Sequence, residues 1–405
     1  MKRQLQLQQL PRGLSQLKID RHVIDPPHVR GIQMEIVDER KEKIFKANLP
    51  LKTFVKKPKL DEAAFCTAIH TILKDHTTGY LLHLRKNGNL THNLVWQWAQ
   101  TPADKNDSWT ESTRMHVASV SKFLTAIGMV KALDSKNVSY DTPIIGYLPD
   151  YWTKGNKINQ ITFRHLLTHK SGFSTGGSDS SYTFMKSRVA MGVSSVGSSS
   201  DYENMNFGLC RILMPIVLGD MPKNANFMPS NTNINDQAWD AVSLQHYTNY
   251  MQDKVFEPAG VNNAGFEPIP GKNNALAYDF PHGSKKGWNS GDLGSMAGGA
   301  AWRLSIKELL DVMNHARRKN TILPSGKFQY LIDNYFGIDQ QINTPAGKLY
   351  NKNGGWGSGG RKEQCVAYVL PDNMELAVFV NSPIGTEDYS LRGLVKDAFV
   401  GCLSE

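Results

Sequence analysis

Residues 116–126 read HVASVSKFLTA, and the interpretation of the whole chain depends on this stretch. Ser119 and Lys122 are three residues apart and apolar residues follow at helical spacing, so the stretch predicts a helix that begins near Ser119. On a helix the two side chains share a face, so the amine can lie against the hydroxyl. A lysine whose pKa is lowered by burial can take the proton of a serine and make it a nucleophile. We therefore expect Ser119 and Lys122 to be catalytic.

The Ser-x-x-Lys spacing is weak evidence alone, because a chain of this length contains about one or two by chance. A second copy, Ser15–Lys18, lies in the polar N-terminal stretch. The run Gly172-Phe173-Ser174-Thr175-Gly176 matches the Gly-x-Ser-x-Gly elbow of α/β-hydrolases. That elbow needs a strand before it and a helix after it, whereas here a helical segment precedes it and a Ser/Gly-rich segment follows. The sequence therefore favours Ser119 as the nucleophile.

A nucleophilic Ser/Lys pair needs further polar groups, and Tyr-x-Asn is a candidate that occurs twice, at Tyr202–Asn204 and Tyr247–Asn249. Tyr247 falls inside an amphipathic helical pattern, which is typical of a packed aromatic residue. Tyr202 falls at a loop-to-helix junction, where its side chain can reach a binding site. We expect Tyr202 to share the proton with Lys122 and Asn204 to contact substrate or position the lysine.

A lysine beside a glycine-rich strand is the third candidate, in the sequence Lys352-Asn353-Gly354-Gly355. The ammonium can bind a substrate carboxylate, and glycines let a ligand approach the backbone closely. The alternative is a solvated lysine next to a flexible turn.

The composition is that of a globular protein: 40% of the 405 residues are apolar and 20% are charged. No run of 18 apolar residues exists, so no transmembrane segment is expected. The net charge is +9, but no nucleic-acid motif accompanies it, so we expect a small-molecule or peptide substrate and no nucleic acid. The four cysteines lack metal-ligand spacing, and no metal or cofactor is implied. The N-terminus lacks the apolar core of a signal peptide, which favours the cytoplasm unless a signal was removed.

Strand-rich segments flank a helix-rich middle. An Asn87–Gly88 pair between two apolar runs predicts a hairpin, and hairpin connections indicate an antiparallel sheet. Strands from both ends of the chain are expected to share that sheet, with a helical domain inserted between them. The predicted division is an N-terminal extension at 1–58, a sheet-containing α/β domain at 59–130 and 290–405, and a helical domain at 131–289 with a Ser/Gly-rich loop or lid at 171–200.

The motifs, taken in chain order, resemble the serine β-lactamase and penicillin-binding-protein superfamily, including class C β-lactamases, family VIII esterases and D-aminopeptidases. HVASVSKFLTA is similar to its nucleophile motif, ITFRHLLTHKSGF to a helical-domain signature, YENMNFGL to its Tyr-x-Asn motif and NKNGG to its Lys-Thr-Gly strand. The resemblance covers about residues 60–403. It implies an α+β fold: an antiparallel sheet flanked by helices as an α/β/α sandwich, with an inserted, mainly helical domain.

Carried over by position, the resemblance implies that Ser119 is acylated and that Lys122 and Tyr202 form the acid/base pair. The backbone N–H groups of Ser119 and Gly355 would form the oxyanion hole. The substrate-binding residues implied are Asn204, Lys352, Asn353, Gly354 and Gly355.

In such a fold the first and last helices pack together, so Cys66 and Cys402 could be within disulfide reach. Buried thiols are the alternative.

The resulting interpretation is a serine hydrolase that acts through an acyl-enzyme on an ester or amide, of the esterase or D-amino-acid peptidase type. The third motif reads Lys-Asn-Gly rather than Lys-Thr-Gly and lacks a hydroxyl that would assist carboxylate binding, so a β-lactamase ranks lower. An acyltransferase would use the same residues. A binding or scaffold protein on an inactive fold is the alternative of another class. Compartment and oligomeric state stay open.

Overall fold

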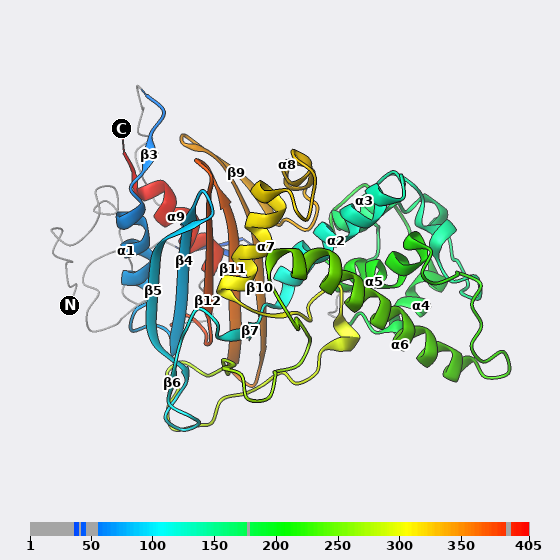
Figure 1. Ribbon diagram of the computed structural model, residues 1–405, viewed down its shortest axis with the longest axis horizontal. Coiled ribbons are helices and arrows are strands. Elements are labelled where there is room, and N and C mark those ends of the chain that lie inside the picture. Colours follow the sequence, from blue (N-terminus) through cyan, green and yellow to red (C-terminus); the bar gives the residue numbers. More distant parts are fainter. Residues whose placement is uncertain (1–35, 40–41, 46–55, 176–178, 386–389, 405) are drawn as a thin grey trace.

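The computed structural model describes residues 36–39, 42–45, 56–175, 179–385 and 390–404. Its centre is a seven-stranded sheet in the order β6-β5-β4-β12-β11-β10-β9, in which every neighbouring pair is antiparallel (Figure 1). The junction of β4 and β12 joins strands from the two ends of the chain, as predicted. The strands are β4 (Gly79–Lys86), β5 (Asn89–Gln100), β6 (Asp107–Ser108), β9 (Gln340–Thr344), β10 (Gly347–Ser358), β11 (Arg361–Leu370) and β12 (Met374–Val380).

The first hairpin of this sheet turns at Asn87–Gly88, where the sequence predicted it. Both residues have positive φ, 52° and 83°. A two-residue turn with both φ values positive matches the right-handed twist of the strands, and asparagine followed by glycine tolerates it best. The smaller pairs are β1 (Ile36–Glu39) with β2 (Glu42–Phe45), β3 (Lys59–Leu60) with β13 (Leu403–Ser404), and β7 (Arg114–His116) with β8 (Arg303–Ser305).

Two helices, α1 (Glu62–Leu73) and α9 (Leu391–Gly401), cover one face of the sheet (Figure 1). The rings of Phe65 and Phe399 meet edge to face between them, 5.8 Å apart. The other face packs against α7 (Ile306–Asn314) and then the helix-rich middle of the chain. Alternate residues of β4, β11 and β12 contribute to the two hydrophobic cores, which explains why these inner strands are buried along most of their length.

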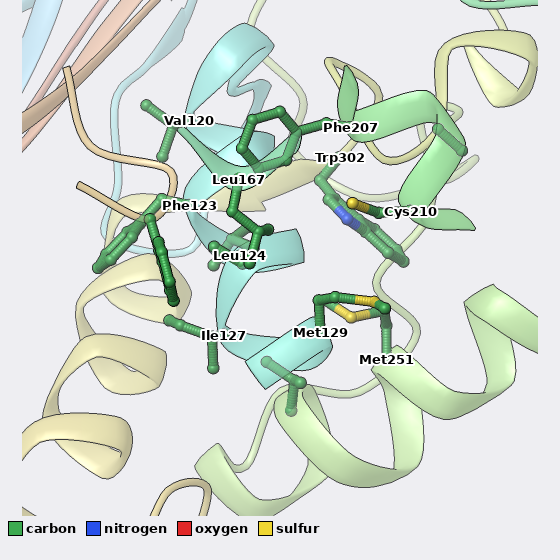
Figure 2. Packing of buried hydrophobic residues seen from close by; sticks show 14 of the residues in the cluster. Val120, Phe123, Leu124, Ile127, Met129, Leu167, Phe207, Cys210, Met251 and Trp302 are labelled. Atoms are coloured by element: carbon green, nitrogen blue, oxygen red, sulfur yellow. The ribbon is translucent and has the colours of Figure 1, made fainter. Parts of the chain in front are cut away.

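The helix that follows Ser119 lies at the junction of these parts. It is α2 (Ser121–Ser135), preceded by the 3₁₀ turn η3 (Ala118–Val120). Figure 2 shows side chains of α2 packed with Phe207, Met251 and Trp302, which come from three other segments. The sequence indicated one apolar face, whereas α2 is buried on almost every side as far as Leu133. A Cβ on Gly128 would lie 2.3 Å from Met251 Sδ, so that close packing depends on the glycine.

The segment 171–200, predicted as a loop or lid, contains the helix α4 (Tyr182–Met191). Its buried residues Tyr182, Met185 and Val189 follow helical spacing, a pattern that the surrounding serines and glycines obscured. The remaining helices are α3 (Phe163–Leu167), α5 (Asn204–Leu218), α6 (Thr232–Met251) and α8 (Lys327–Asp333), with π-helical turns at Gln252–Phe256 and His315–Lys319 and 3₁₀ turns at Ile144–Tyr147, Ile158–Gln160, Glu257–Ala259 and Gly294–Met296.

The cysteines are all buried thiols, so Cys66 and Cys402 are not joined in a disulfide. Burial, with smaller contributions from Glu62 and Cys402, raises the pKa of Cys66 to about 12. None of the helices in the described part of the chain combines the length and apolar character that a membrane-spanning segment needs.

Asp397 on α9 is a buried carboxyl, 8% exposed, and burial raises its pKa from 3.8 to about 6 although Lys396 lies 3.1 Å away. The folded state therefore disfavours the charged form, and this penalty grows as the pH rises from the unfolded-state value to the folded one. We expect Asp397→Asn to raise the free energy of unfolding above pH 6, by up to about 3 kcal/mol.

Asp397→Asn should change the free energy of unfolding little near pH 3.5, where the carboxyl is largely protonated in both the folded and the unfolded state. Urea unfolding of wild type and variant at the two pH values measures this difference. An equal effect at both pH values would contradict an electrostatic origin.

Candidate active site

Ser119 lies in η3, between the helix-rich part of the chain and strand β10. Val117, the residue before the turn, is held through both of its backbone groups: Val117 N–H donates to Trp302 O at 3.0 Å, and Cys365 Sγ donates to Val117 O at 3.0 Å. Ala118 has φ 45°, a conformation that costs an alanine free energy and that surrounding contacts must maintain. Ser119 is half-buried, while its neighbours in η3 are buried, so its side chain is the accessible one of the turn.

Lys122 is buried completely, and its amine lies among three oxygens from three segments. Nζ is 3.0 Å from Ser119 Oγ, 2.5 Å from Asn204 Oδ1 and 2.9 Å from the carbonyl of Gly299. A neutral amine has two N–H groups and one lone pair. Because an amide oxygen and a carbonyl can only accept, they orient the two N–H groups and leave the lone pair for the serine O–H.

Burial lowers the pKa of Lys122; Tyr202 opposes this shift and Lys352 adds to it. A lowered pKa raises the fraction of lysine that is neutral and able to accept a proton near neutral pH. The arrangement can thus deprotonate Ser119.

Tyr202 lies between the two lysines. Lys122 Nζ and Lys352 Nζ are each 4.7 Å from the centroid of its ring, and Lys352 donates to its Oη at 3.3 Å. The ring stacks on the imidazole of His169, with centroids 4.5 Å apart, yet 51% of the residue remains exposed. Burial of the hydroxyl end would raise the pKa of Tyr202, but the two ammonium groups outweigh this and the pKa is lowered.

His169 is held neutral at this position. Burial and the two nearby lysines keep its pKa well below the usual range. Its Nδ1 accepts from the backbone N–H of Glu203 at 3.2 Å, so the imidazole fixes the chain next to Tyr202. His169 occurs in the stretch ITFRHLLTHKSGF, but no spacing rule assigned it to the site.

Lys352 is buried, 1% exposed, and carries the opposite pKa shift to Lys122. Burial alone would lower its pKa, but the Asp339 carboxylate and Tyr202 outweigh burial and raise it. Asp339 Oδ1 lies 2.5 Å from Lys352 Nζ, and Oδ2 accepts from Asn353 N–H at 2.9 Å. Asp339 is 13 residues from Lys352 and matches no motif, so the sequence did not predict it.

Strand β10 brings Gly354 against the nucleophile turn. A Cβ on Gly354 would lie 2.5 Å from Val117 O and 3.1 Å from Ser119 N, so only glycine permits this approach. Asn353 N–H points to the edge of β10 away from β11, because it donates to Asp339. Since N–H groups alternate between the two edges of a strand, the N–H of Gly355 points to that same edge. This direction of the Gly355 N–H agrees with the expected oxyanion hole, which the N–H groups of Ser119 and Gly355 would form.

The structure thus brings Ser119, Lys122, Tyr202, Asn204 and Lys352 into one connected group. Asn353 joins it through its backbone N–H, and Gly354 through close approach. The alternative Tyr247–Asn249 pair does not join it: Tyr247 is buried, and its Oη lies 2.8 Å from Thr125 Oγ1 and 3.2 Å from Trp302 Nε1. Within the described residues no group of three His, Cys, Asp or Glu side chains could hold a metal ion.

A model of the beta-lactamase family matches residues 61–398, and the chain therefore belongs to that family. This agrees with the resemblance that the motifs indicated. A comparison with curated protein sequences gives no match.

Solved structures share the fold at low sequence identity. The octameric penicillin-binding protein homologue from Pyrococcus abyssi is 16% identical over 83% of this chain and 76% of that chain, with a TM-score of 0.62. The D-amino acid amidase from Ochrobactrum anthropi SV3, complexed with L-phenylalanine amide, is 18% identical over 82% and 98%, with a TM-score of 0.60. A class C beta lactamase from Rhodobacter sphaeroides is 14% identical over 84% and 99%, with a TM-score of 0.58. At these identities the likeness shows the fold.

Substitution of Gly354 tests the close approach of β10 to the nucleophile turn. Gly354→Ala should lower the rate at which a fluorophosphonate labels Ser119 by roughly 100-fold, because the methyl group displaces the serine by a fraction of an ångström or more. The measurement is intact mass against time.

The matched control is Gly355→Ala. Its Cβ meets nothing closer than Lys362 Cε at 3.7 Å and its N–H is kept, so its loss should be far smaller. Equal losses in the two variants would contradict the proposed packing.

The pH dependence of labelling tests the charges around Lys122. Labelling should rise with pH as the base loses its proton and should level off below the ordinary lysine pKa of 10.5, since the pKa of Lys122 is lowered. Lys352→Met removes a neighbouring positive charge, so the midpoint should move up by roughly one unit.

Lys348→Met makes the same chemical change at an exposed position of the same strand and should leave the midpoint in place. A midpoint that Lys352→Met does not move, or that both variants move alike, would count against this electrostatic coupling.

Proposed function

We propose that the protein is a serine hydrolase that cleaves an ester or amide through an acyl-enzyme on Ser119. The observation that carries the proposal is the position of Lys122 Nζ, 3.0 Å from Ser119 Oγ, with Asn204 Oδ1 and the Gly299 carbonyl oxygen as acceptors of its N–H groups. Membership of the beta-lactamase family and the fold shared with an amidase and a class C beta lactamase support the same class of chemistry.

In the acylation step Ser119 Oγ attacks the carbonyl carbon, and its proton passes to Lys122 Nζ. The carbonyl oxygen gains negative charge and accepts from the N–H groups of Ser119 and Gly355. The C–O or C–N bond of the substrate then breaks, and the leaving alcohol or amine takes a proton by way of Tyr202, whose pKa is lowered toward the working range. Asn204 keeps Lys122 in place throughout.

In the second step a water molecule gives its proton to the same base, attacks the ester of Ser119 and releases the acid. An acyltransferase would use the same side chains with an alcohol or amine in place of water. A D-amino-acid amide or peptide is one substrate type within this class; the solved amidase with this fold is named for that activity.

The experiment that tests the proposal measures intact mass after incubation with a fluorophosphonate and, separately, with a penicillin. We expect the wild type to gain the mass of the fluorophosphonate adduct and Ser119→Ala to gain none. A penicillin adduct on Ser119 would favour D-amino-acid peptides or β-lactams as substrates.

The control is Ser121→Ala, which removes a buried hydroxyl two residues away that accepts from Trp302 N–H. It should still be labelled. If the folded wild type takes up neither reagent, the proposal fails in favour of a binding protein on an inactive fold.

A further inference from the structure

Asp339 lies at the position where a carboxylate would bind Lys352. One oxygen is 2.5 Å from Lys352 Nζ, and the other accepts from Asn353 N–H at 2.9 Å. Arg392 Nη1 is 3.5 Å from that second oxygen. A backbone bond fixes the residue itself, since Asp339 N–H donates to Asn351 O at 2.9 Å. The carboxylate is therefore held by two cations and a backbone donor.

The ammonium of Lys352 has no solvent-facing surface to offer a second anion. The residue is 1% exposed, and its amine contacts Asp339 and Tyr202. A substrate carboxylate approaching it would meet the negative charge of Asp339 at short range, and like charges at such a distance repel strongly. Asn353 follows the lysine directly, so the motif carries an amide at the position where the threonine of Lys-Thr-Gly would offer a hydroxyl to a carboxylate.

We infer that Asp339 is a specificity-determining residue that occupies the carboxylate position of the site, so that the enzyme takes acyl donors with no carboxylate beside the scissile bond. The inference rests on the proposed function and names its substrate class: esters, thioesters or amides whose leaving group is uncharged. It assigns Lys352 to the electrostatics of Lys122 and Tyr202 rather than to substrate recognition.

The test compares two thioesters that differ only in charge, phenylacetyl-thioglycolate and phenylacetyl-thioglycolamide. Release of the thiol gives kcat/KM for each. The wild type should prefer the amide-bearing thioester by roughly tenfold or more, and Asp339→Asn should raise the ratio of acid to amide by roughly tenfold or more, because it removes the repelling charge. A ratio within a factor of about two of the wild type would overturn the inference.

The ratio of kcat/KM for the acid thioester to kcat/KM for the amide thioester distinguishes a specificity role of Asp339 from a positioning role. If Asp339 only orients Lys352, both thioesters should slow equally and the ratio should stay constant. Asp333→Asn is the matched control: Asp333, on α8, is exposed and pairs with Tyr350 Oη at 2.5 Å, so the same loss of charge occurs away from Lys352. Its ratio should equal that of the wild type.

A second measurement on the wild type keeps the inference falsifiable if Asp339→Asn does not fold. Phenylacetamide should slow fluorophosphonate labelling of Ser119 at a concentration where phenylacetate does not. Equal or better protection by phenylacetate would overturn the inference. If a fluorophosphonate labels the wild type but the wild type prefers the acid-bearing thioester, the inference fails while the proposed function stands. If the wild type is not labelled at all, the proposed function itself fails.

Discussion

The buried amine of Lys122 is the constraint on which the rest of the site depends. An ammonium or amine in an apolar core is costly unless its N–H groups are bonded, and the three oxygens that surround it come from η3, the start of α5 and the segment at Gly299. These segments are far apart in the sequence. Satisfying one lysine therefore requires these three segments to meet in one arrangement, which also places Tyr202 next to Asn204 and η3 against Gly354 of β10.

Two buried lysines lie on either side of one tyrosine, and their surroundings push their pKa values in opposite directions. Lys122 has neutral oxygens around it, and burial lowers its pKa. Lys352 has a carboxylate, and its pKa rises. Groups of the same type whose pKa values are separated by their environment can take different roles, one as the base and the other as a fixed positive charge. Lys122 and Lys352 together lower the pKa of Tyr202 against the effect of burial, and Lys352 is the contribution of β10 to the proton transfer that we propose.

Local patterns predicted the parts of the site that lie within one element or beside one turn. Ser119 and Lys122 are three residues apart in η3 and α2, and Tyr202 and Asn204 flank the start of α5, so their spacing together with the resemblance of the motifs identified them. The Asn87–Gly88 hairpin followed from turn chemistry. The helix α4 was missed because serines and glycines surround it, although Tyr182, Met185 and Val189 have helical spacing. Asp339 and Gly299 could not be predicted, since each reaches its lysine through the pairing of distant segments.

That difference also explains why the motifs define the reaction more closely than the substrate. The proposed removal of the Ser119 proton needs only one amine within hydrogen-bond distance of the hydroxyl. The three-residue spacing of Ser119 and Lys122 places that amine. In the inference drawn above, substrate choice depends on charged groups from separate parts of the chain: Lys352 on β10, Asp339 in the bend before β9 and Arg392 on α9. In this chain the Asp339 carboxylate pairs with Lys352, the lysine that the third motif supplies, and with Arg392. The Lys-Asn-Gly motif alone would predict an anionic substrate, whereas the Asp339 carboxylate beside its lysine favours an uncharged one at the site that we propose.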